Sequence, residues 1–306
     1  MAQGGGGMTR ARKAEVFRPL SPAMEDYLKT IYTLQEEHAT VTTQLLADFQ
    51  GVAPASVTHM LKRLAEHKLV HYTPYHGVAL TEAGRKVAIE MVRHHRLLEL
   101  YLTQALGFGW DEVHAEAERL EHFISEKLEE RIDAALGYPK MDPHGSPIPS
   151  LDGTVVDRGG GPLRDQPPGE RSVVLQVADE EGSALRRFAE IGLWPGVTVE
   201  VLEHGPAASR VRVANRVWDL EDELCALIRV TPSTGHYLSA DQMHSGQTGH
   251  IHRLRAGGER LRRLRGLGLE QGREVTARDE LTYRVDGRDL ELSREEARCI
   301  LVELPG

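Results

Sequence analysis

The sequence has few cysteines, no long apolar stretch and no apolar segment at its start, and each absence excludes a class of protein. Its 306 residues include only two cysteines, Cys225 and Cys299, which are too few for a disulfide scaffold and fit a reducing cytoplasm. No apolar run approaches the roughly 20 residues of a membrane span. Residues 1–7 are polar and glycine-rich, without the apolar core of a secretory signal. We therefore expect a cytoplasmic protein without a membrane segment.

Charge and composition are those of an ordinary globular protein. Hydrophobic residues make up 40% and charged residues 27% of the chain, and its length predicts two or more domains. The net charge of −9 argues against binding polyanions through the whole surface, although a local basic patch remains compatible with it. Neither a Ser-His-Asp order nor a glycine-rich phosphate loop is evident, so we do not expect an enzyme.

The N-terminal part of the chain shows the order of a winged helix-turn-helix. A Ser-Pro pair at 21–22 suits the N-cap and first position of one helix. Apolar periodicity predicts a short second helix over 43–49 and a third that begins at Pro54. Two short alternating segments, 69–72 and 78–80, predict a hairpin that would form the wing. This order favours a DNA-binding module.

The outward face of the third predicted helix carries residue types that read DNA. Small hydroxyls near its beginning and two cations further along suit a helix in the major groove. The alternative is a helical hairpin inside an unrelated helical protein, and the order of elements favours DNA binding over it. The residues that we expect to contact DNA are Ser56, Thr58, His59, Lys62 and Arg63.

One acidic stretch concentrates potential metal ligands. His114, Glu118, Glu121 and His122 fall at i, i+4, i+7 and i+8 of a helix predicted over 111–136, which places them along one face. Two imidazoles and two carboxylates can bind a divalent metal, and the absence of sulfur favours Mn(II) or Fe(II). The alternative is a solvated acidic face with two incidental histidines.

A second pair of potential ligands precedes this stretch. A long helix predicted over 81–106 carries His95 and Glu99, which are four residues apart and share a face. After the acidic helix, residues 138–170 are rich in proline and glycine, so most of them are predicted to form a linker.

The C-terminal region contains an internal repeat with an offset of 76 residues. Segment 185–199 matches segment 261–275, and each copy ends in an apolar strand that begins with cysteine, 225–228 and 299–302. In both copies a short helix leads through a Gly-Leu-x-x-Gly turn into several short strands, which predicts two small β-barrels. Because each cysteine opens an apolar run, both are predicted to be core residues rather than ligands.

Three separated motifs, at 24–32, 95–99 and 114–122, resemble those of the diphtheria-toxin-repressor and manganese-transport-regulator family of metal-dependent repressors. The Gly-Ser-Pro-Ile-Pro run at 145–149 is similar as well, so the resemblance covers residues 21–150. The two C-terminal repeats look like SH3-like domains of the FeoA type. One such domain is usual in the long members of the family, and a second is a departure.

The resemblance implies a mostly α-helical N-terminal half, with a winged helix-turn-helix and a helical dimerisation domain, followed by two small SH3-like β-barrels. The predicted domains are a flexible basic tail at 1–20, a DNA-binding domain at 21–85, a metal-binding and dimerisation domain at 86–150, a linker at 151–170, and FeoA-type domains at 171–231 and 232–306.

Two metal ions per chain follow from the resemblance. The residues that match the primary site are Asp26, Glu118, Glu121 and His122. The residues that match the ancillary site are His95, Glu99 and His114, to which an SH3-like domain can add a side chain, with Glu181 near that place. Carboxylates stand where iron-responsive members have sulfur ligands, which favours Mn(II), with Fe(II) as the other candidate.

The resemblance further implies a regulator that represses metal-uptake genes and binds a palindromic DNA operator as a homodimer when metal is bound. Asp26 precedes the recognition helix and the other primary ligands lie in the dimerisation domain, so a shared metal would tie the DNA-reading part to the dimer. The alternatives are an iron-responsive regulator of the same family and, with less support, a helical di-metal enzyme. Such enzymes use Glu-x-x-His motifs, which neither Glu118 nor Glu121 completes.

Overall fold

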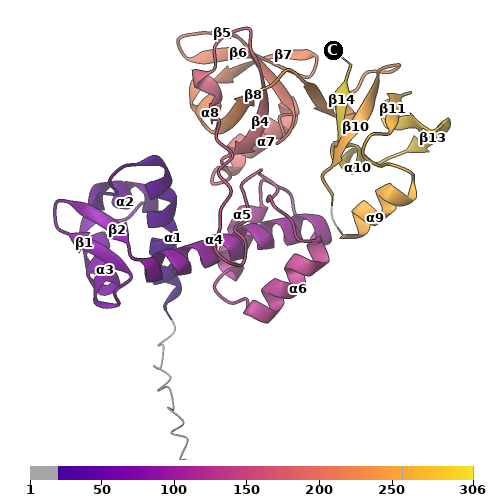
Figure 1. The fold of residues 1–306 in the computed structure, drawn as a ribbon. Helices are drawn as coiled ribbons and strands as arrows, with labels where there is room; N and C mark the ends of the chain where they lie inside the picture. Colours follow the sequence, from indigo (N-terminus) through magenta and orange to yellow (C-terminus); the bar gives the residue numbers. More distant parts are fainter. Residues whose placement is uncertain (1–19, 257, 306) are drawn as a thin grey trace, which may run out of the picture. The chain divides into compact units, whose positions relative to one another are not determined.

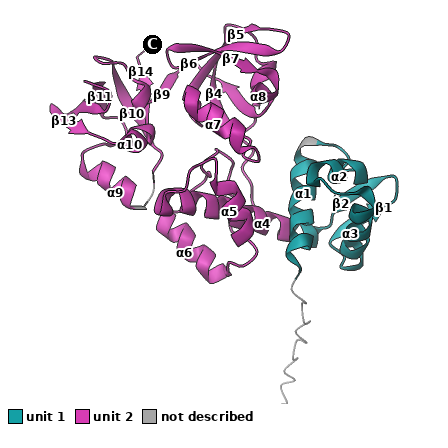
Figure 2. Ribbon diagram, turned by 180° about the vertical axis from the view of Figure 1, so that it is seen from behind, with its two compact units in different colours: residues 1–85 teal, residues 86–306 magenta. Residues whose placement is uncertain are grey.

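The computed structural model describes residues 20–256 and 258–305. The chain divides into two compact units, residues 1–85 and residues 86–306 (Figure 2). The first unit is mainly helical, and the second has a helical part followed by two β-rich parts (Figure 1). Every helix in the described part of the chain is too short or too polar to span a lipid bilayer.

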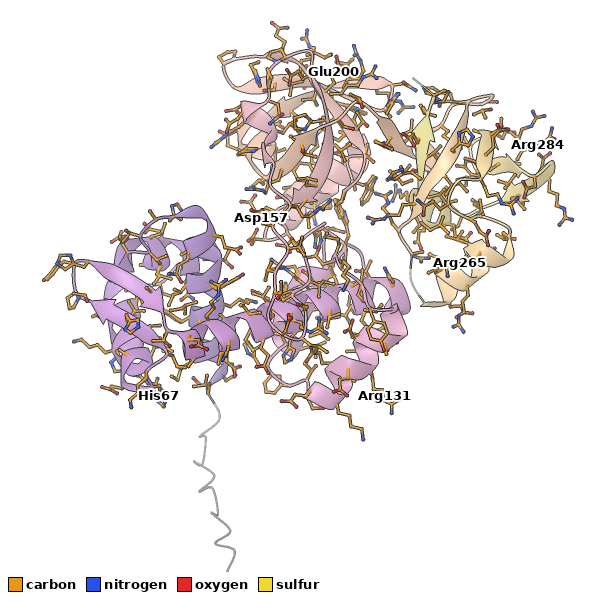
Figure 3. All side chains as sticks on the ribbon, viewed as in Figure 1. His67, Arg131, Asp157, Glu200, Arg265 and Arg284 are labelled. Atoms are coloured by element: carbon orange, nitrogen blue, oxygen red, sulfur yellow. The ribbon has the colours of Figure 1, made fainter. Side chains whose placement is uncertain are left out.

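The first unit consists of three helices and a hairpin. Its elements are α1 (Pro22–Glu37), α2 (Thr43–Gln50), α3 (Pro54–Glu66), β1 (Val70–Thr73) and β2 (Gly77–Leu80). The Thr42 hydroxyl accepts a hydrogen bond from the Leu45 amide and so caps the start of α2. Gly51, at φ +64°, ends α2 in a left-handed conformation that favours glycine. His67, labelled in Figure 3, marks the end of α3.

A small apolar core holds these helices together. Leu28 of α1, Leu46 of α2 and Leu61 of α3 are all fully buried. The hairpin pairs β1 with β2 in antiparallel register, with Val70 opposite Leu80. The elements occur in the order predicted from the sequence, with boundaries within one or two residues.

The second unit's helical part contains α4 (Glu82–Tyr101), the π-helical turn η1 (Leu102–Leu106), α5 (Val113–Leu120) and α6 (Glu126–Leu136). The prediction of one helix over 111–136 was wrong, because the chain leaves the helical path after α5. Ser125 starts the new helix by accepting a hydrogen bond from the Leu128 amide. Glu121 and His122 therefore lie in the turn between two helices, rather than on one helical face with His114.

A buried ionic network joins α4 to α6. The Arg93 guanidinium donates to Glu129 and, at 2.6 Å, to Asp133. His94 Nε2 lies 3.2 Å from Glu129 Oε2. Burial alone would raise the pKa of Glu129, but hydrogen bonds from His94 and Arg93 lower it. The network therefore keeps a carboxylate charged inside the helical part, where an unpaired charge would be costly.

The first β-rich part is a six-stranded sheet in the order β3-β8-β4-β5-β6-β7. Its elements are β3 (Gly161–Pro162), η2 (Leu163–Asp165), β4 (Arg171–Val177), α7 (Gly182–Ile191), β5 (Thr198–His204), β6 (Ala208–Val213), β7 (Arg216–Glu221), α8 (Asp222–Ala226) and β8 (Ile228–Pro232). Because β3 pairs with β8, residues 161–162, placed in the linker from the sequence, belong to this sheet, and η2 follows them directly.

The second β-rich part is a six-stranded sheet in the order β13-β12-β11-β10-β14-β9. Its elements are β9 (His236–Ser239), η3 (Ala240–Gln242), β10 (Thr248–Leu254), α9 (Gly258–Gly266), β11 (Glu274–Ala277), β12 (Thr282–Val285), β13 (Arg288–Glu291), α10 (Arg294–Arg298) and β14 (Ile300–Leu304). Arg265, labelled in Figure 3, lies on α9.

Neither sheet closes into the barrel that we predicted. A barrel requires its two outermost strands to pair with each other. In the described residues β3 and β7 each pair on one side only, and so do β9 and β13. The edge strand β3 has only two residues, both of which pair with β8.

The sequence repeat is also a structural repeat. In each copy a helix, α7 or α9, follows a central strand of the sheet and is itself followed by a left-handed glycine, Gly192 or Gly268. Each sheet has its own apolar core. The two cores share side chains: Leu301 of β14 is buried in the core of the first copy, and Tyr237 of β9 packs against that core.

Candidate metal centre

Histidines and carboxylates from three segments of the second unit converge on one point. Nε2 of His95, on α4, lies 3.0 Å from Glu99 Oε1 and 3.1 Å from Nδ1 of His114 on α5. That Nδ1 atom lies 3.3 Å from Glu99 Oε1 and 3.8 Å from Oδ2 of Asp179, in the loop between β4 and α7. Ligand atoms that share one ion, each at about 2.0–2.2 Å from it, have similar separations.

A second group of donor atoms shares Glu99 and Asp179 with the first. It adds Asp142 and His144, from the loop that follows α6. His144 Nδ1 lies 3.6 Å from Glu99 Oε2 and 3.5 Å from Asp179 Oδ2. Within each group the donor atoms all lie within 4.8 Å of one another. The two groups therefore form one continuous cluster.

Hydrogen bonds fix Asp142 and His144 so that one atom of each faces the cluster. Asp142 Oδ1 accepts from the amides of His144 and Ser146, at 2.8 and 2.9 Å. His144 Nε2 donates to the Trp110 carbonyl at 2.7 Å, and the His144 ring stacks on the Trp110 indole. Asp142 Oδ2, His144 Nδ1 and Glu99 Oε2 are buried and have no hydrogen-bond partner among the described residues.

Backbone contacts join this loop to β4. The Val177 amide donates to the His144 carbonyl at 3.0 Å. Gly145 has φ +91°, and a Cβ there would lie 2.2 Å from the Leu175 carbonyl oxygen, so only glycine permits this approach. The loop that carries His144 is thereby held in register with the strand that leads to Asp179.

The charges of the cluster depend strongly on one another. Burial alone would lower the pKa of His144, but the carboxylates of Glu99, Asp179 and Asp142 raise it to about 10. Burial raises the pKa of Asp142 to about 7, and Glu99 adds to the rise. Burial alone would also raise the pKa of Glu99, but the neighbouring histidines hold it well below its usual range. A divalent cation would take over the neutralising role that protons have here.

Glu121, which the sequence predicts to belong to the primary site, contacts this cluster. Its Oε2 lies 2.5 Å from His95 Nδ1, and its side chain is buried. A carboxylate on the rear nitrogen of a ligand histidine fixes the ring and its tautomer. His122 Nε2 lies 3.8 Å from Glu121 Oε1, whereas Glu118, 3.6 Å from His114 Nε2, is 53% exposed.

The ancillary ligands predicted from the sequence are partly brought together. His95, Glu99 and His114 meet in one cluster. Glu181 is exposed at the start of α7, and Asp179, two positions earlier, faces His114 instead. The sequence has three consecutive acids at 179–181, any of which could supply a carboxylate. The path of the loop decides which of them faces the cluster.

Asp142 and His144 were not among the predicted ligands. The available signal was the Asp-x-His spacing directly before Gly145, in a loop whose direction the sequence does not reveal. Asp26 lies half-buried on α1, in the first unit, and its role in a metal site stays a prediction.

The residues predicted to contact DNA lie on α3. Four of them are exposed: Ser56, His59, Lys62 and Arg63. Thr58 is half-buried, and its hydroxyl donates to the Pro54 carbonyl at 3.0 Å. Thr58 and Lys62 also line a hollow of about 500 Å³ with the hairpin, whose tip carries the fully exposed Tyr75. These side chains are accessible for contact with a ligand as large as DNA.

Family models match the chain in three parts. The model of the iron dependent repressor, N-terminal DNA binding domain, matches residues 19–78. The model of the iron dependent repressor, metal binding and dimerisation domain, matches residues 81–150. The FeoA domain model matches twice, at residues 161–232 and 239–304. The metal cluster is thus built from the metal-binding domain and the first FeoA domain.

Characterised proteins resemble the chain over most of their length. The iron-dependent repressor IdeR of Mycobacterium leprae is 33% identical over 201 residues, which are 60% of this chain and 85% of that protein. The diphtheria toxin repressor of Corynebacterium efficiens is 30% identical over 233 residues, which are 71% of this chain and 99% of that protein.

Two solved structures with the same fold are named for manganese. A manganese-dependent transcriptional repressor in complex with manganese is 38% identical, with a TM-score of 0.65, and the match covers 69% of this chain and 100% of that one. The manganese regulator SloR is 30% identical, with a TM-score of 0.60, over 70% of this chain and 100% of that one. Members of this family are regulators rather than enzymes. The chain therefore belongs to the iron-dependent repressor family and is a metal-dependent, DNA-binding transcriptional regulator.

Proposed function

We propose that this regulator responds to Mn(II) and represses metal-uptake genes. The observation that carries the proposal is the sulfur-free cluster of His95, Glu99, His114 and Asp179. Imidazole nitrogen and carboxylate oxygen suit Mn(II) and Fe(II), whereas thiolate and thioether select softer ions. Buried donor atoms without hydrogen-bond partners also fit a site made for a cation. Fe(II) is the alternative ion, because the similar curated proteins are iron-dependent repressors.

The primary site of this proposal takes Asp26 from the DNA-binding domain and Glu118, Glu121 and His122 from the dimerisation domain. Its support is the resemblance in sequence to the family. A bound divalent ion supplies positive charge that offsets the repulsion among these carboxylates. It can shift the DNA-binding equilibrium only by its differential affinity for the DNA-competent arrangement, and tenfold tighter DNA binding needs about 1.4 kcal/mol of coupling.

The proposed dimer uses apolar side chains that the helical part leaves exposed. Leu120, Phe123 and Leu128 are 37%, 76% and 48% exposed, and they lie on or between α5 and α6. The family model of this region is that of a dimerisation domain. We expect Phe123→Asp to sediment as a monomer in analytical ultracentrifugation, while Leu151→Asp, at another exposed site, leaves the dimer intact. A dimeric Phe123→Asp protein would contradict this interface.

A dimer with two-fold symmetry presents two copies of α3, so the proposed operator is palindromic double-stranded DNA. Half-sites about 34 Å apart would place the two helices in successive major grooves. Ser56, Thr58, His59, Lys62 and Arg63 are the proposed contact residues. We place the protein in the cytoplasm, where it meets chromosomal DNA.

Operator binding tests the proposal. An operator fragment is first selected from genomic DNA, and its affinity is then measured by fluorescence anisotropy with and without Mn(II). We expect Mn(II) to tighten binding at least tenfold for the wild-type protein, and Asp26→Ala to lose most of that gain. Glu36→Ala, an exposed acid on the same helix, is the matched control and should behave as wild type. Equal operator affinities of all three proteins, unchanged by Mn(II), would contradict the proposal. Anaerobic titration with Fe(II) identifies the preferred ion.

A further inference from the structure

The two oxygens of Glu99 face two different sets of ligands. Oε1 faces the nitrogens of His95 and His114, at 3.0 and 3.3 Å. Oε2 faces Nδ1 of His144, at 3.6 Å, a distance too long for a hydrogen bond. The Glu99 side chain is fully buried, so neither oxygen is satisfied by bulk water.

Asp179 faces the same two sides, but through a single oxygen. Its Oδ2 atom lies 3.8 Å from His114 Nδ1 and 3.5 Å from His144 Nδ1. Two carboxylates from different domains thus stand between one pair of histidines and a third histidine. Bridging carboxylates in this position are typical of sites that hold two metal ions about 3.5–4 Å apart.

The histidine tautomers set by the surrounding hydrogen bonds suit metal binding on both sides. His144 Nε2 is engaged by the Trp110 carbonyl, so its proton resides there and the lone pair of Nδ1 faces the cluster. His95 Nδ1 is engaged by the Glu121 carboxylate, which leaves the lone pair of Nε2 for the cluster. On each side of the cluster, therefore, a hydrogen bond to one ring nitrogen of a histidine orients the other nitrogen towards the cluster.

Three buried atoms of the His144 side lack any hydrogen-bond partner among the described residues: Glu99 Oε2, Asp142 Oδ2 and His144 Nδ1. Each belongs to a residue that is more than nine-tenths buried. A buried polar atom without a partner carries a desolvation penalty of about 1–3 kcal/mol, so three that meet at one point call for a ligand.

We propose that the ancillary cluster binds two divalent ions side by side, bridged by Glu99 and Asp179. One ion is held by His95, His114 and Glu99 Oε1, and the other by His144, Asp142 and Glu99 Oε2. Glu99, Asp179 and Asp142 offset three of the four positive charges of the two ions. Of the charged side chains next to them, Glu121 on His95 Nδ1 adds a negative charge, and Arg96, whose Nε lies 3.9 Å from Asp142 Oδ2, adds a positive one. This inference rests on the proposed function and extends it from two ions per chain to three.

Mn(II) stoichiometry and electron paramagnetic resonance on the full-length protein test the inference. We expect three Mn(II) per chain by equilibrium dialysis and elemental analysis, with a spectrum that contains an exchange-coupled Mn(II) pair. His144→Gln and Asp142→Asn should each bind two ions and lose the coupled signal while retaining an isolated one. Glu130→Gln, which neutralises an exposed acid on α6, should keep three ions and the coupled signal.

Two ions per wild-type chain without a coupled signal would overturn the inference, as would a His144→Gln protein that retains both three ions and the pair. The wild-type spectrum decides the question even if the buried variants fail to fold, which circular dichroism checks. The proposed function fails separately, through metal-independent operator binding. Operator binding that depends on Mn(II), in a protein with only two ions per chain, would support the proposed function and contradict only the ion pair in the ancillary cluster.

Discussion

The two FeoA domains of this chain differ in the loop between the central strand and the helix. In the first domain the loop between β4 and α7 contains three acids, and Asp179 faces the metal cluster. In the second domain the shorter loop between β10 and α9 contains no acid. Its Arg255 instead donates to the carbonyl of Pro195 in the first domain, at 2.8 Å, and to the carbonyl of Arg298. One loop places a carboxylate in the candidate metal cluster, and the other loop attaches its domain to the first FeoA domain.

In the described residues the second FeoA domain contributes packing contacts to the first one. Leu301 fills part of the first domain's core, and the Arg298 guanidinium lies 5.4 Å from the centre of the Trp194 ring. Trp194 in turn contacts Trp110, with ring centres 4.3 Å apart, and Trp110 stacks on His144. A continuous set of packed side chains therefore runs from the second FeoA domain to the metal cluster.

The largest expected effect on stability comes from truncating Leu301, the side chain of the second FeoA domain that is buried in the core of the first. Leu301→Ala should lower the free energy of unfolding by about 2–5 kcal/mol in urea titrations, because it leaves a cavity in the first domain. Hydrogen exchange should then accelerate in β4 and β5 as well as in the second domain. Leu292→Ala, in the second domain's own core, is the matched change and should affect that domain alone. Identical exchange patterns for both variants would contradict the division of roles.

Removing the carboxylate of the first loop should weaken metal binding. Asp179→Asn is expected to reduce Mn(II) affinity in calorimetric titrations by at least about tenfold, or roughly 1.4 kcal/mol, because a charged ligand is lost. Asp219→Asn, an exposed acid of the same domain, should bind as wild type. Ala256→Asp should create no site in the second domain, since its described residues form no group of three or more histidine, cysteine or carboxylate side chains that could hold an ion. An unchanged Mn(II) affinity of Asp179→Asn would mean that the loop between β4 and α7 contributes no more to metal binding than the loop between β10 and α9.

The metal-free protein should lose stability as the pH rises. The pKa of His144 is raised from 6.5 to about 10, so its contribution is complete below the lower value and is lost up to the higher one. The pKa of Asp142, raised from 3.8 to about 7, acts in the same direction over a lower range. With saturating Mn(II) the trend should reverse, because ligands must be deprotonated to bind metal.

The melting temperature in EDTA and in Mn(II), measured across this pH range, checks the expectation. Local hydrogen exchange should follow pH in the loop between β4 and α7, and much less in the loop between β10 and α9. His144→Gln should flatten the dependence in EDTA. A stability that rises with pH in EDTA would count against the charge assignment of the cluster.

The smallest expected effect concerns the Arg298 contact. Arg298→Ala should lower the free energy of unfolding by about 0.5–1 kcal/mol, the size of a partly exposed cation–π contact. Arg262→Ala, an exposed arginine of α9, should change stability less. A loss as large as that of Leu301→Ala would mean that the arginine, and not the shared core, holds the domains together.

Local sequence signals were sufficient for the DNA-binding domain and for the repeat. Capping residues such as Thr42 and the left-handed Gly51 act on their immediate neighbours, so the pattern identifies the elements directly. The sequence predicted a single helix because apolar periodicity continues through the break between α5 and α6, where Ser125 caps the second helix. Barrel closure depends on whether distant edge strands meet, which no local pattern reports.

The metal cluster was predictable only where its spacing is helical. His95 and Glu99 share a helix face, so their proximity follows from the sequence. Asp179 and His144 reach the cluster through loops, whose paths are set by contacts between domains. The same contacts decide that Glu181 lies on the surface.

Gly145 has a consequence for how such proteins can be recombined. Because Gly145 has no side chain, its loop can lie against Leu175. The contact surface between the metal-binding domain and the first FeoA domain therefore includes the candidate metal cluster. A chimaera that takes its FeoA domains from a relative would keep the cluster only if residues 142–147 came from the same relative. The metal-binding domain and the first FeoA domain are therefore expected to be inherited as one cassette, while the second FeoA domain, whose described residues add no side chain to the cluster, can be gained or lost as a separate module.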